Sequence, residues 1–254
     1  MSKISQTGSS TPGFGYFFYH YVWMVIDVFY PPVCSGCEKP GIRWCDECNS
    51  KVQIIKAPFC QVCGTPLQRG GSCDECREHP PQFDRLRSLA VFGGPLRTAL
   101  HGLKYRRDQG IAEILAAPLI NIVDREAWEF DIIVPVPLSK PHLRERGYNQ
   151  AEMIARPLAL GLKKPCVVDA VIRSKETSSQ VALSPAERYA NLQDAFSANP
   201  AKLKGRNVLL LDDVATTGAT LNSCSKALKD AGAKTVLCLT VAKTLRKGNV
   251  ASVG

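Results

Sequence analysis

Two adjacent aspartates, Asp212 and Asp213, follow a run of apolar residues, and a loop of alanine, threonine and glycine comes directly after them. The apolar run, 208–211, predicts a buried strand that the two carboxylates end, and the residues beyond the loop predict the start of a helix. Backbone N–H groups at a helix start attract an anion, and carboxylates at the end of a strand can bind hydroxyls. The segment therefore predicts a site for a sugar that carries a phosphate.

An apolar strand followed by two acids is also typical of the magnesium-binding strand of P-loop NTPases. That assignment needs a G-x-x-x-x-G-K-[ST] segment, and the sequence has none. Thr216, Thr217 and Thr220 offer hydroxyls, and Gly218 lets the backbone approach an anion. A purely structural role for the acids is disfavoured, because adjacent carboxylates are costly to bury without partners.

Eight of the eleven cysteines form C-x-x-C pairs, in which each pair can present two thiolates to a metal. The pairs are Cys34/Cys37, Cys45/Cys48, Cys60/Cys63 and Cys73/Cys76. Two pairs make one tetrahedral site, so we expect two zinc ions, with one zinc, disulfides or an iron–sulfur centre as alternatives. Joining the first pair to the second and the third to the fourth is favoured because each closes as a short hairpin, but crossed arrangements stay open.

The cysteine module is expected to serve as a structural staple or a contact surface. Four thiolates around one Zn²⁺ carry a formal charge of about −2, and residues 1–80 are otherwise neutral, with seven Lys/Arg and seven Asp/Glu. Two such sites make the module acidic, which disfavours direct binding to phosphates.

The elements that must position these residues follow from the hydrophobic pattern along the chain. Residues 1–13 predict a loose tail, 14–30 a short aromatic helix, 31–80 the cysteine module, and 81–254 alternating strands and helices. Strands are expected at 86–92, 131–137, 167–172, 207–211 and 234–241, and helices at 95–105, 111–123, 148–162 and 218–231. This alternation predicts an α/β domain with an open parallel sheet.

The polar segment 173–196 has the composition of a mobile lid, which would exclude water from a reactive ligand. Gln180, Arg188 and Asn191 would then contact the ligand on closure. The alternative is a surface loop that carries a short capped helix at 184–192.

The formal charge of +9 lies entirely in residues 81–254, which carry 25 Lys/Arg against 16 Asp/Glu. This excess suits a polyphosphate substrate or nucleic acid, with an ordinary solvated basic surface as the alternative. No membrane span or signal peptide is predicted, because His20 and Asp27 interrupt the apolar tract near the N-terminus. We therefore expect a cytoplasmic protein.

The segment 208–221 resembles the signature of the type I phosphoribosyltransferases, which combines an apolar run, an acid pair and a Thr-Thr-Gly loop. The resemblance implies that Asp212 and Asp213 hold the ribose 2′- and 3′-hydroxyls of phosphoribosyl pyrophosphate, which binds with Mg²⁺. It implies that the 5′-phosphate lies on the loop formed by Ala215, Thr216, Thr217, Gly218, Ala219 and Thr220.

Further motifs, taken together with the double cysteine module, resemble the ComF family from about Trp23 to Thr244. They are Leu103-Lys104-Tyr105, the R-x-R-G-Y-N-Q run 144–150, the T-x-x-Q-x-x-L run 177–183, the R-x-x-N run 188–191, and Ala195-Phe196. The resemblance implies a double zinc ribbon joined to a type I phosphoribosyltransferase-like domain. It also implies a role in DNA uptake and natural transformation, with single-stranded DNA and uptake proteins such as a helicase or a strand-binding protein as partners. A transferase reaction is not generally established for this family.

In a phosphoribosyl transfer, cationic groups stabilise the departing pyrophosphate. We expect Lys104, Arg144 and Arg146 in this role, and Gln180 as a further ligand contact. The resemblance implies that the two arginines lie in a pyrophosphate loop after the strand 131–137. Asp213 could act as a weak base. No feature of the sequence identifies the acceptor of the phosphoribosyl group.

The same basic surface could track a single strand of DNA, with tyrosines available for stacking. The groove would be lined by Lys104, Arg106, Arg107, Lys140, His142, Arg144 and Arg146, with Tyr105 and Tyr148 beside it. Three functions therefore stay open: a DNA-handling protein of this fold, an active transferase of nucleotide salvage or modification, and a non-catalytic ligand sensor.

Overall fold

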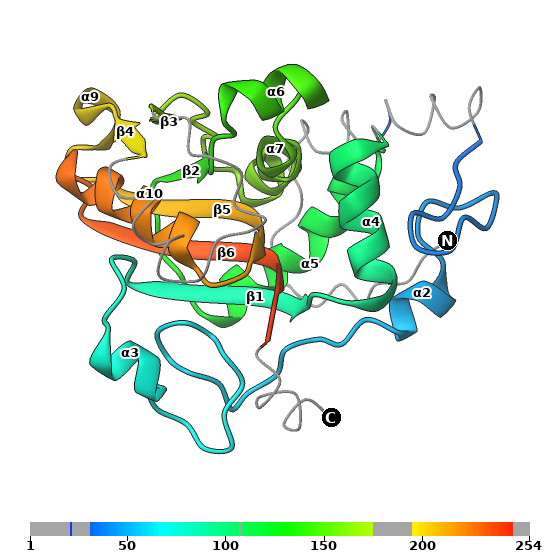
Figure 1. The fold of residues 1–254 in the computed structure, drawn as a ribbon, viewed down its shortest axis with the longest axis horizontal. Helices are drawn as coiled ribbons and strands as arrows, with labels where there is room; N and C mark the ends of the chain where they lie inside the picture. The colour runs from blue at the N-terminus through cyan, green and yellow to red at the C-terminus, as the bar shows by residue number, and fades with distance from the viewer. Residues whose placement is uncertain (1–20, 22–30, 107, 175–194, 246–254) are drawn as a thin grey trace.

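A sheet of four parallel strands, in the order β1-β6-β5-β2, lies at the centre of the computed structural model (Figure 1). The structure describes residues 21, 31–106, 108–174 and 195–245. The strands of this sheet are β1 (Arg85–Val91), β2 (Ile132–Pro135), β5 (Asn207–Ala215) and β6 (Thr235–Lys243). The predicted open parallel α/β sheet is confirmed.

Helices and a small second sheet cover the parallel sheet. The described helices are α2 (Asp46–Ser50), α3 (Asp74–Glu78), α4 (Gly94–Tyr105), α5 (Ile111–Arg125), α6 (Lys140–Arg146), α7 (Gln150–Leu162), α9 (Pro200–Leu203) and α10 (Ala219–Asp230). The second sheet is an antiparallel pair of β3 (Val171–Arg173) and β4 (Phe196–Ala198). In the view of Figure 1, α10 lies in front of the parallel sheet and α5 lies behind it.

Strand β5 is buried on both faces because its side chains alternate between two hydrophobic cores. Leu209 and Leu211 belong to the first core, which includes residues of α4, α5 and α7. Val208 and Leu210 belong to the second core, which includes residues of α10. A strand with two buried faces favours an apolar run, and residues 208–211 supply one.

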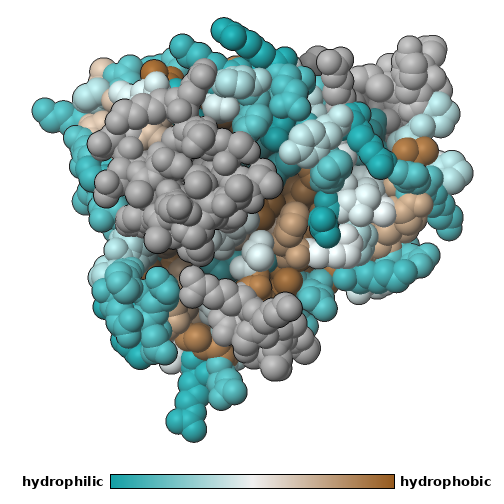
Figure 2. Space-filling model, in the orientation of Figure 1, coloured by the Kyte–Doolittle hydropathy of each residue, from teal (hydrophilic) through white to brown (hydrophobic). Residues whose placement is uncertain are grey.

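The chain leaves β2 and β5 toward opposite faces of the sheet. Helix α7, which comes after β2, packs into the first core, whereas α10, which follows β5, packs into the second core. Since β2 and β5 are neighbours, a crevice is expected between the segments that follow them, at the carboxyl ends of the strands. Figure 2 shows a group of hydrophobic residues near the middle of the face that is turned to the viewer in Figure 1.

Strand β5 is longer than the sequence predicted. Asp212 pairs with Thr240 of β6, so the first aspartate lies inside the ladder. The ladder continues to Ala215, which pairs with Lys243. The prediction that the two acids end the strand is wrong, because backbone pairing with a long neighbouring strand continues regardless of the polarity of the side chains.

Short elements account for the other differences. Strand β3 begins at Val171, whereas the sequence predicted a strand over 167–172. Strand β4 and the short helices α6 and α9 were not predicted, because elements of three to seven residues show no measurable periodicity. Helix α6 also has no buried residue, so it lacks the apolar stripe by which helices are recognised.

The eight cysteines of the C-x-x-C pairs gather in two clusters. The first cysteine cluster is Cys34, Cys37, Cys45 and Cys48, and the second cysteine cluster is Cys60, Cys63, Cys73 and Cys76. Three members of the first cluster, together with Trp44, belong to the first hydrophobic core. The second cluster lies beside β1, where Val62 and Cys63 pack against the second core. The module is thus packed on the sheet domain at two separate places.

Several predicted features lie outside the described residues. They are the tail 1–13, the aromatic helix 14–30 (Tyr21 apart), the helix 184–192, the side chain of Arg107, and the ligand contacts Gln180, Arg188 and Asn191. The boundaries at residues 30 and 80 stay predictions. Within the described residues, no helix combines the length and apolar composition that a membrane crossing requires.

Candidate functional site

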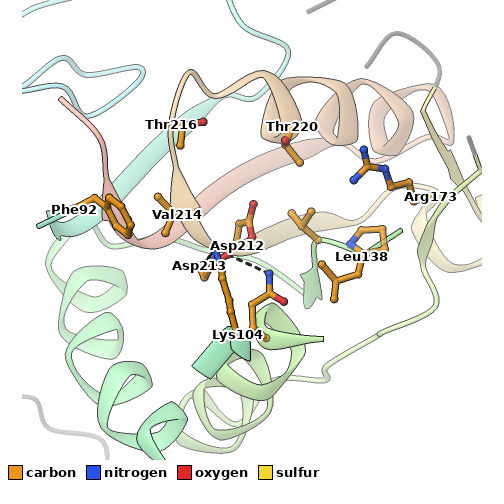
Figure 3. Close-up of a pocket in the computed structure, with 12 residues that line it drawn as sticks. Phe92, Lys104, Leu138, Arg173, Asp212, Asp213, Val214, Thr216 and Thr220 are labelled. Atoms are coloured by element: carbon orange, nitrogen blue, oxygen red, sulfur yellow. Dashed lines mark hydrogen bonds and ion pairs between the residues drawn. The ribbon is translucent and has the colours of Figure 1, made fainter. Parts of the chain in front are cut away.

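A cavity of about 250 Å³ lies at the carboxyl ends of β2 and β5, where the crevice was expected. Its walls combine acidic, cationic, hydroxyl and apolar side chains. They are Phe92, Lys104, Val136, Pro137, Leu138, Gln150, Arg173, Asp212, Asp213, Val214, Thr216 and Thr220. In Figure 3, Thr216 and Thr220 lie on one side of the aspartates, and Lys104 approaches them from the other side.

Asp213 is held by residues from two helices of the first core. Lys104 of α4 places its Nζ 2.5 Å from Asp213 Oδ2, and Gln150 of α7 donates from Nε2 to Asp213 Oδ1 at 3.3 Å. The Asp213 side chain is 4% exposed, whereas that of Lys104 is 24% exposed. The carboxylate is therefore fixed in one orientation, while the ammonium still reaches solvent and could bind a second anion.

Asp212 has a different environment. Its Oδ1 accepts the backbone N–H of Asp213 at 2.8 Å, and among the described residues no cation forms an ion pair with it. Burial and the negative charge of Asp213 raise the pKa of Asp212 well above its usual value, and Lys104 offsets part of this effect. A buried carboxyl of this kind gains a partner when a hydroxyl or a metal ion enters the cavity.

The loop after β5 has the features of an anion site. Gly218 adopts a left-handed conformation with φ +81°, which a residue with a side chain would adopt only under strain, and it is the N-cap of α10. Thr217 Oγ1 accepts the N–H of Ala219 at 3.3 Å, so this hydroxyl caps the helix rather than facing the cavity. Thr216 and Thr220 line the cavity. The N–H groups of Thr220 and Leu221, in the first turn of α10, have no acceptor inside the helix and are available to an anion.

Of the predicted cationic residues, Lys104 lines the cavity and the two arginines do not. Arg144 is exposed on α6. Arg146 donates to Gln150 Oε1 at 2.9 Å and to the hydroxyl of Tyr105 at 3.2 Å, and its guanidinium lies 4.8 Å from the centre of the Tyr105 ring. Because Gln150 also donates to Asp213, Arg146 is connected to the acid pair through one intervening side chain.

Two polar residues of the cavity wall were missed as site residues. Arg173, the last residue of β3, lines the wall, and Figure 3 shows it on the far side of the aspartates from Phe92. Its guanidinium lies 5.8 Å from the centre of the Phe196 ring, and desolvation lowers its pKa. Gln150 was noted only as part of a motif. For Arg173, the sequence offered only a weak signal, namely an arginine directly after two apolar residues. Nothing in the sequence indicated that Gln150 contacts Asp213.

The two cysteine clusters have the geometry of structural metal sites. In each cluster, the four sulfur atoms lie within 4.8 Å of one another, so the sequential pairing of the knuckles is confirmed. Two such four-cysteine sites are consistent with two zinc ions. The crossed pairings that the sequence left open are excluded by this grouping.

Backbone N–H groups in each cluster point at sulfur, as in metal-binding knuckles. Cys34 Sγ accepts the N–H of Cys45 at 3.4 Å, and Cys60 Sγ accepts that of Cys73 at 3.3 Å. Burial acts to raise the pKa of Cys34, but these N–H groups outweigh burial and lower it to about 6. The same balance lowers the pKa of Cys60 to about 7. One thiol in each cluster is therefore prepared to bind a metal as the thiolate.

Comparison with known proteins agrees with this arrangement. The model of the double zinc ribbon domain matches residues 25–77, and the model of the phosphoribosyl transferase domain matches residues 143–250. Competence protein F of Haemophilus influenzae is 33% identical to the chain, over 80% of it and 87% of the relative. DNA utilization protein YhgH of Escherichia coli K12 is 32% identical, over 85% of the chain and 98% of the relative. Competence protein ComFC of Bacillus subtilis is 27% identical, over 76% of the chain and 81% of the relative.

The two cysteine clusters should differ in their effect on stability. We expect two zinc ions per chain in the wild type and one in either Cys45→Ser or Cys73→Ser. Cys45→Ser should lower the free energy of unfolding by about 4 kcal/mol or more, because Cys45 belongs to the first hydrophobic core. Cys73→Ser should lower it by less, since Cys73 is partly exposed. Elemental analysis and urea unfolding measure both quantities.

Cys166→Ser is the matched control, because Cys166 lies outside both clusters. It should keep two zinc ions. Two zinc ions in Cys45→Ser, or disulfides in place of the metal, would contradict the assignment.

Asp212→Asn should raise Tm at neutral pH. A carboxyl whose folded pKa is raised adds stability below its unfolded pKa, and this contribution is lost as pH rises through the folded pKa. At pH 7.5 the neutral amide should therefore raise Tm by at least about 2 °C, the shift that roughly 1 kcal/mol produces in a chain of this size. The difference should shrink as pH falls toward 4. Thermal unfolding of both proteins between pH 4 and pH 8 measures it.

Asp230→Asn serves as the control, because Asp230 is exposed and pairs with Lys226 on the same helix. It should not raise Tm at any pH. An Asp212→Asn variant that melts below the wild type at pH 7.5 would show that the carboxylate is stabilised in the free protein.

Proposed function

The chain belongs to the ComF family of competence and DNA utilization proteins, and on this premise we propose that its cavity binds phosphoribosyl pyrophosphate or a related sugar phosphate together with Mg²⁺. We propose further that this binding serves the handling of single-stranded DNA in the cytosol, in natural transformation.

The observation that carries the ligand proposal is the meeting of Asp212, Thr216 and Thr220 in one cavity at the N-terminus of α10. A phosphorylated pentose presents hydroxyls at one end and an anion at the other. Asp212 and Asp213 would accept hydrogen bonds from the ribose hydroxyls, and residues 215–220 would surround the 5′-phosphate. The raised pKa of Asp212 supports this assignment, because a hydroxyl donor would stabilise its ionised form.

Two cations of the wall suit the pyrophosphate group of the same ligand. Lys104 has three N–H donors and is partly exposed, so it can hold Asp213 and a phosphate oxygen at the same time. Arg173 approaches from the other side of the cavity. Mg²⁺ binds carboxylate and phosphate oxygens. The carboxylate of Asp212 could serve as a ligand, because among the described residues no cation forms an ion pair with it. Mg²⁺ would neutralise charge on the pyrophosphate.

The DNA proposal rests on the excess charge of residues 81–254 and on α6. Lys140, His142 and Arg144 are exposed along this helix, which begins a few residues after β2 and the cavity wall. Other residues of the predicted groove are already engaged, since Arg106 forms an ion pair with Glu38 and Arg146 lies on Tyr105. We therefore propose α6 as the DNA-contacting element.

Two further functions remain compatible with the cavity. An active transferase would use the same site with a nitrogenous base as acceptor, and a ligand sensor would bind without turnover. Pyrophosphate release that depends on an added base would establish the transferase. Tight binding without release, together with a changed affinity for a DNA-uptake protein, would favour the sensor.

Calorimetry with phosphoribosyl pyrophosphate and Mg²⁺ tests the ligand proposal. We expect the double variant Asp212→Asn/Asp213→Asn to bind at least about 10-fold more weakly than the wild type, because hydrogen bonds to two charged acceptors are lost. Asp230→Asn should bind like the wild type. No heat with the wild type would refute the ligand proposal and leave the fold unchanged.

Fluorescence anisotropy with a labelled oligonucleotide tests the DNA proposal. Lys140→Gln/Arg144→Gln should weaken binding by about 3- to 10-fold and reduce the dependence of affinity on salt, since two phosphate contacts are lost. Lys234→Gln is the control, because Lys234 is exposed at the opposite, amino-terminal end of β6. Binding should survive in Asp212→Asn/Asp213→Asn. If Lys140→Gln/Arg144→Gln bound DNA with the same affinity and salt dependence as Lys234→Gln, a role for α6 would be contradicted.

A further inference from the structure

Lys243 is a buried lysine that joins the second cysteine cluster to the sheet. It is the last residue of β6, it is 7% exposed, and its Nζ donates to the carbonyl oxygen of Cys63 at 3.2 Å. Among the described residues, no carboxylate forms an ion pair with it. An ammonium buried against one main-chain carbonyl is costly, so a compensating negative charge is expected nearby.

The second cysteine cluster supplies that charge when it holds a metal. Four thiolates around one Zn²⁺ carry a formal charge of about −2. Cys63, whose carbonyl accepts from Lys243, is one of the four ligating residues of this cluster. The arrangement of a cation beside a negatively charged metal site is the kind of outer-shell contact that tunes metal affinity.

Three consecutive carbonyls of the knuckle 60–63 accept hydrogen bonds from the sheet. Gln61 O accepts from Arg87 Nη1 at 3.0 Å, and Val62 O accepts from the N–H of Leu86 at 2.7 Å. Cys63 O accepts from Lys243, as described above. Arg87 also pairs with Glu126 at 2.8 Å, so its charge is already balanced, whereas that of Lys243 is not.

The knuckle can approach β1 this closely because of Gly64. A Cβ atom at this position would lie 2.7 Å from the carbonyl oxygen of Leu86, and Gly64 has φ +68°. Gly70, in the same cluster segment, has no atom within 4 Å of an added Cβ. The two glycines therefore form a matched pair for perturbing the contact.

The backbone of Lys243 contacts a residue of the cavity wall. Its carbonyl oxygen accepts the N–H of Phe92 at 2.8 Å, and Phe92 lines the cavity. In the sheet, Lys243 pairs with Ala215, the residue that precedes the phosphate loop, and Thr244 N donates to Ala215 O at 2.9 Å. One residue thus contacts the cysteine cluster with its side chain and the cavity wall with its backbone.

We propose that Lys243 is a positioning residue that couples the second metal site to the phosphate loop. Metal in the second cluster holds the Lys243 side chain, and the Lys243 backbone then holds Phe92 and Ala215 in the arrangement that binds ligand. This inference rests on the proposed function of the cavity as a sugar-phosphate site. Because coupling between two binding sites is reciprocal, ligand in the cavity should also strengthen zinc binding at the second cluster.

Competition with a chromogenic zinc chelator, with and without phosphoribosyl pyrophosphate and Mg²⁺, tests the coupling. The second site is identified as the zinc that Cys73→Ser lacks. In the wild type, the sugar phosphate should tighten this zinc by about 5-fold or more, and the first site should not respond. Lys243→Met should weaken second-site zinc by about 10-fold and remove its response to the ligand. Lys243→Arg should restore most of both effects, and Lys226→Met, at an exposed lysine of α10, should match the wild type.

Gly64→Ala and Gly70→Ala test the same contact from the knuckle, should Lys243→Met fail to fold. Gly64→Ala should weaken second-site zinc and sugar-phosphate binding together, and Gly70→Ala should change neither. If the wild type binds the sugar phosphate but its zinc affinity at the second cluster does not change, the coupling is overturned and the proposed function stands. Wild-type zinc and ligand affinities in Lys243→Met would also overturn it. No sugar-phosphate binding by the wild type would refute the proposed function, and the coupling with it.

Discussion

Adjacent residues of a β-strand point to opposite faces, and this constraint governs the acid pair. Asp212 and Asp213 are consecutive residues of β5, so they cannot share a partner within the sheet. Asp213 meets Lys104 and Gln150 from the helices of the first core, whereas Asp212 keeps a carboxyl that no described cation neutralises. Asp213 is therefore fixed by two side chains of the protein, while Asp212 lines the cavity without such partners among the described residues.

The crevice that holds the acids depends on the order of the strands. Helices that follow two neighbouring strands must pack on opposite faces for a crevice to form at the strand ends. Here α7 and α10 do so, and Thr220 in the first turn of α10 lines the cavity. The acids, the cations and the loop 215–220 therefore meet without any one segment of the chain carrying all of them.

The cysteine module is packed on the same framework at two places, and the two contacts differ in kind. The first cluster contributes buried side chains to the first hydrophobic core. The second cluster rests on hydrogen bonds from β1 and β6, through Arg87, Leu86 and Lys243. A hydrophobic contact is spread over many apolar atoms, whereas a contact of this second kind depends on a few polar groups.

The sequence by itself determined the features that lie within short contiguous segments. The apolar run, the acids and the loop 215–220 are local, as are the four C-x-x-C pairs, so their chemistry could be predicted from residue types and spacing. The tertiary structure alone decided the partners that lie far apart in the chain. Lys104 and Gln150 reach Asp213 from different helices, Arg173 enters the cavity from a three-residue strand, and Lys243 meets Cys63 across 180 positions. These contacts follow from the order in which the strands assemble, and no local pattern encodes that order.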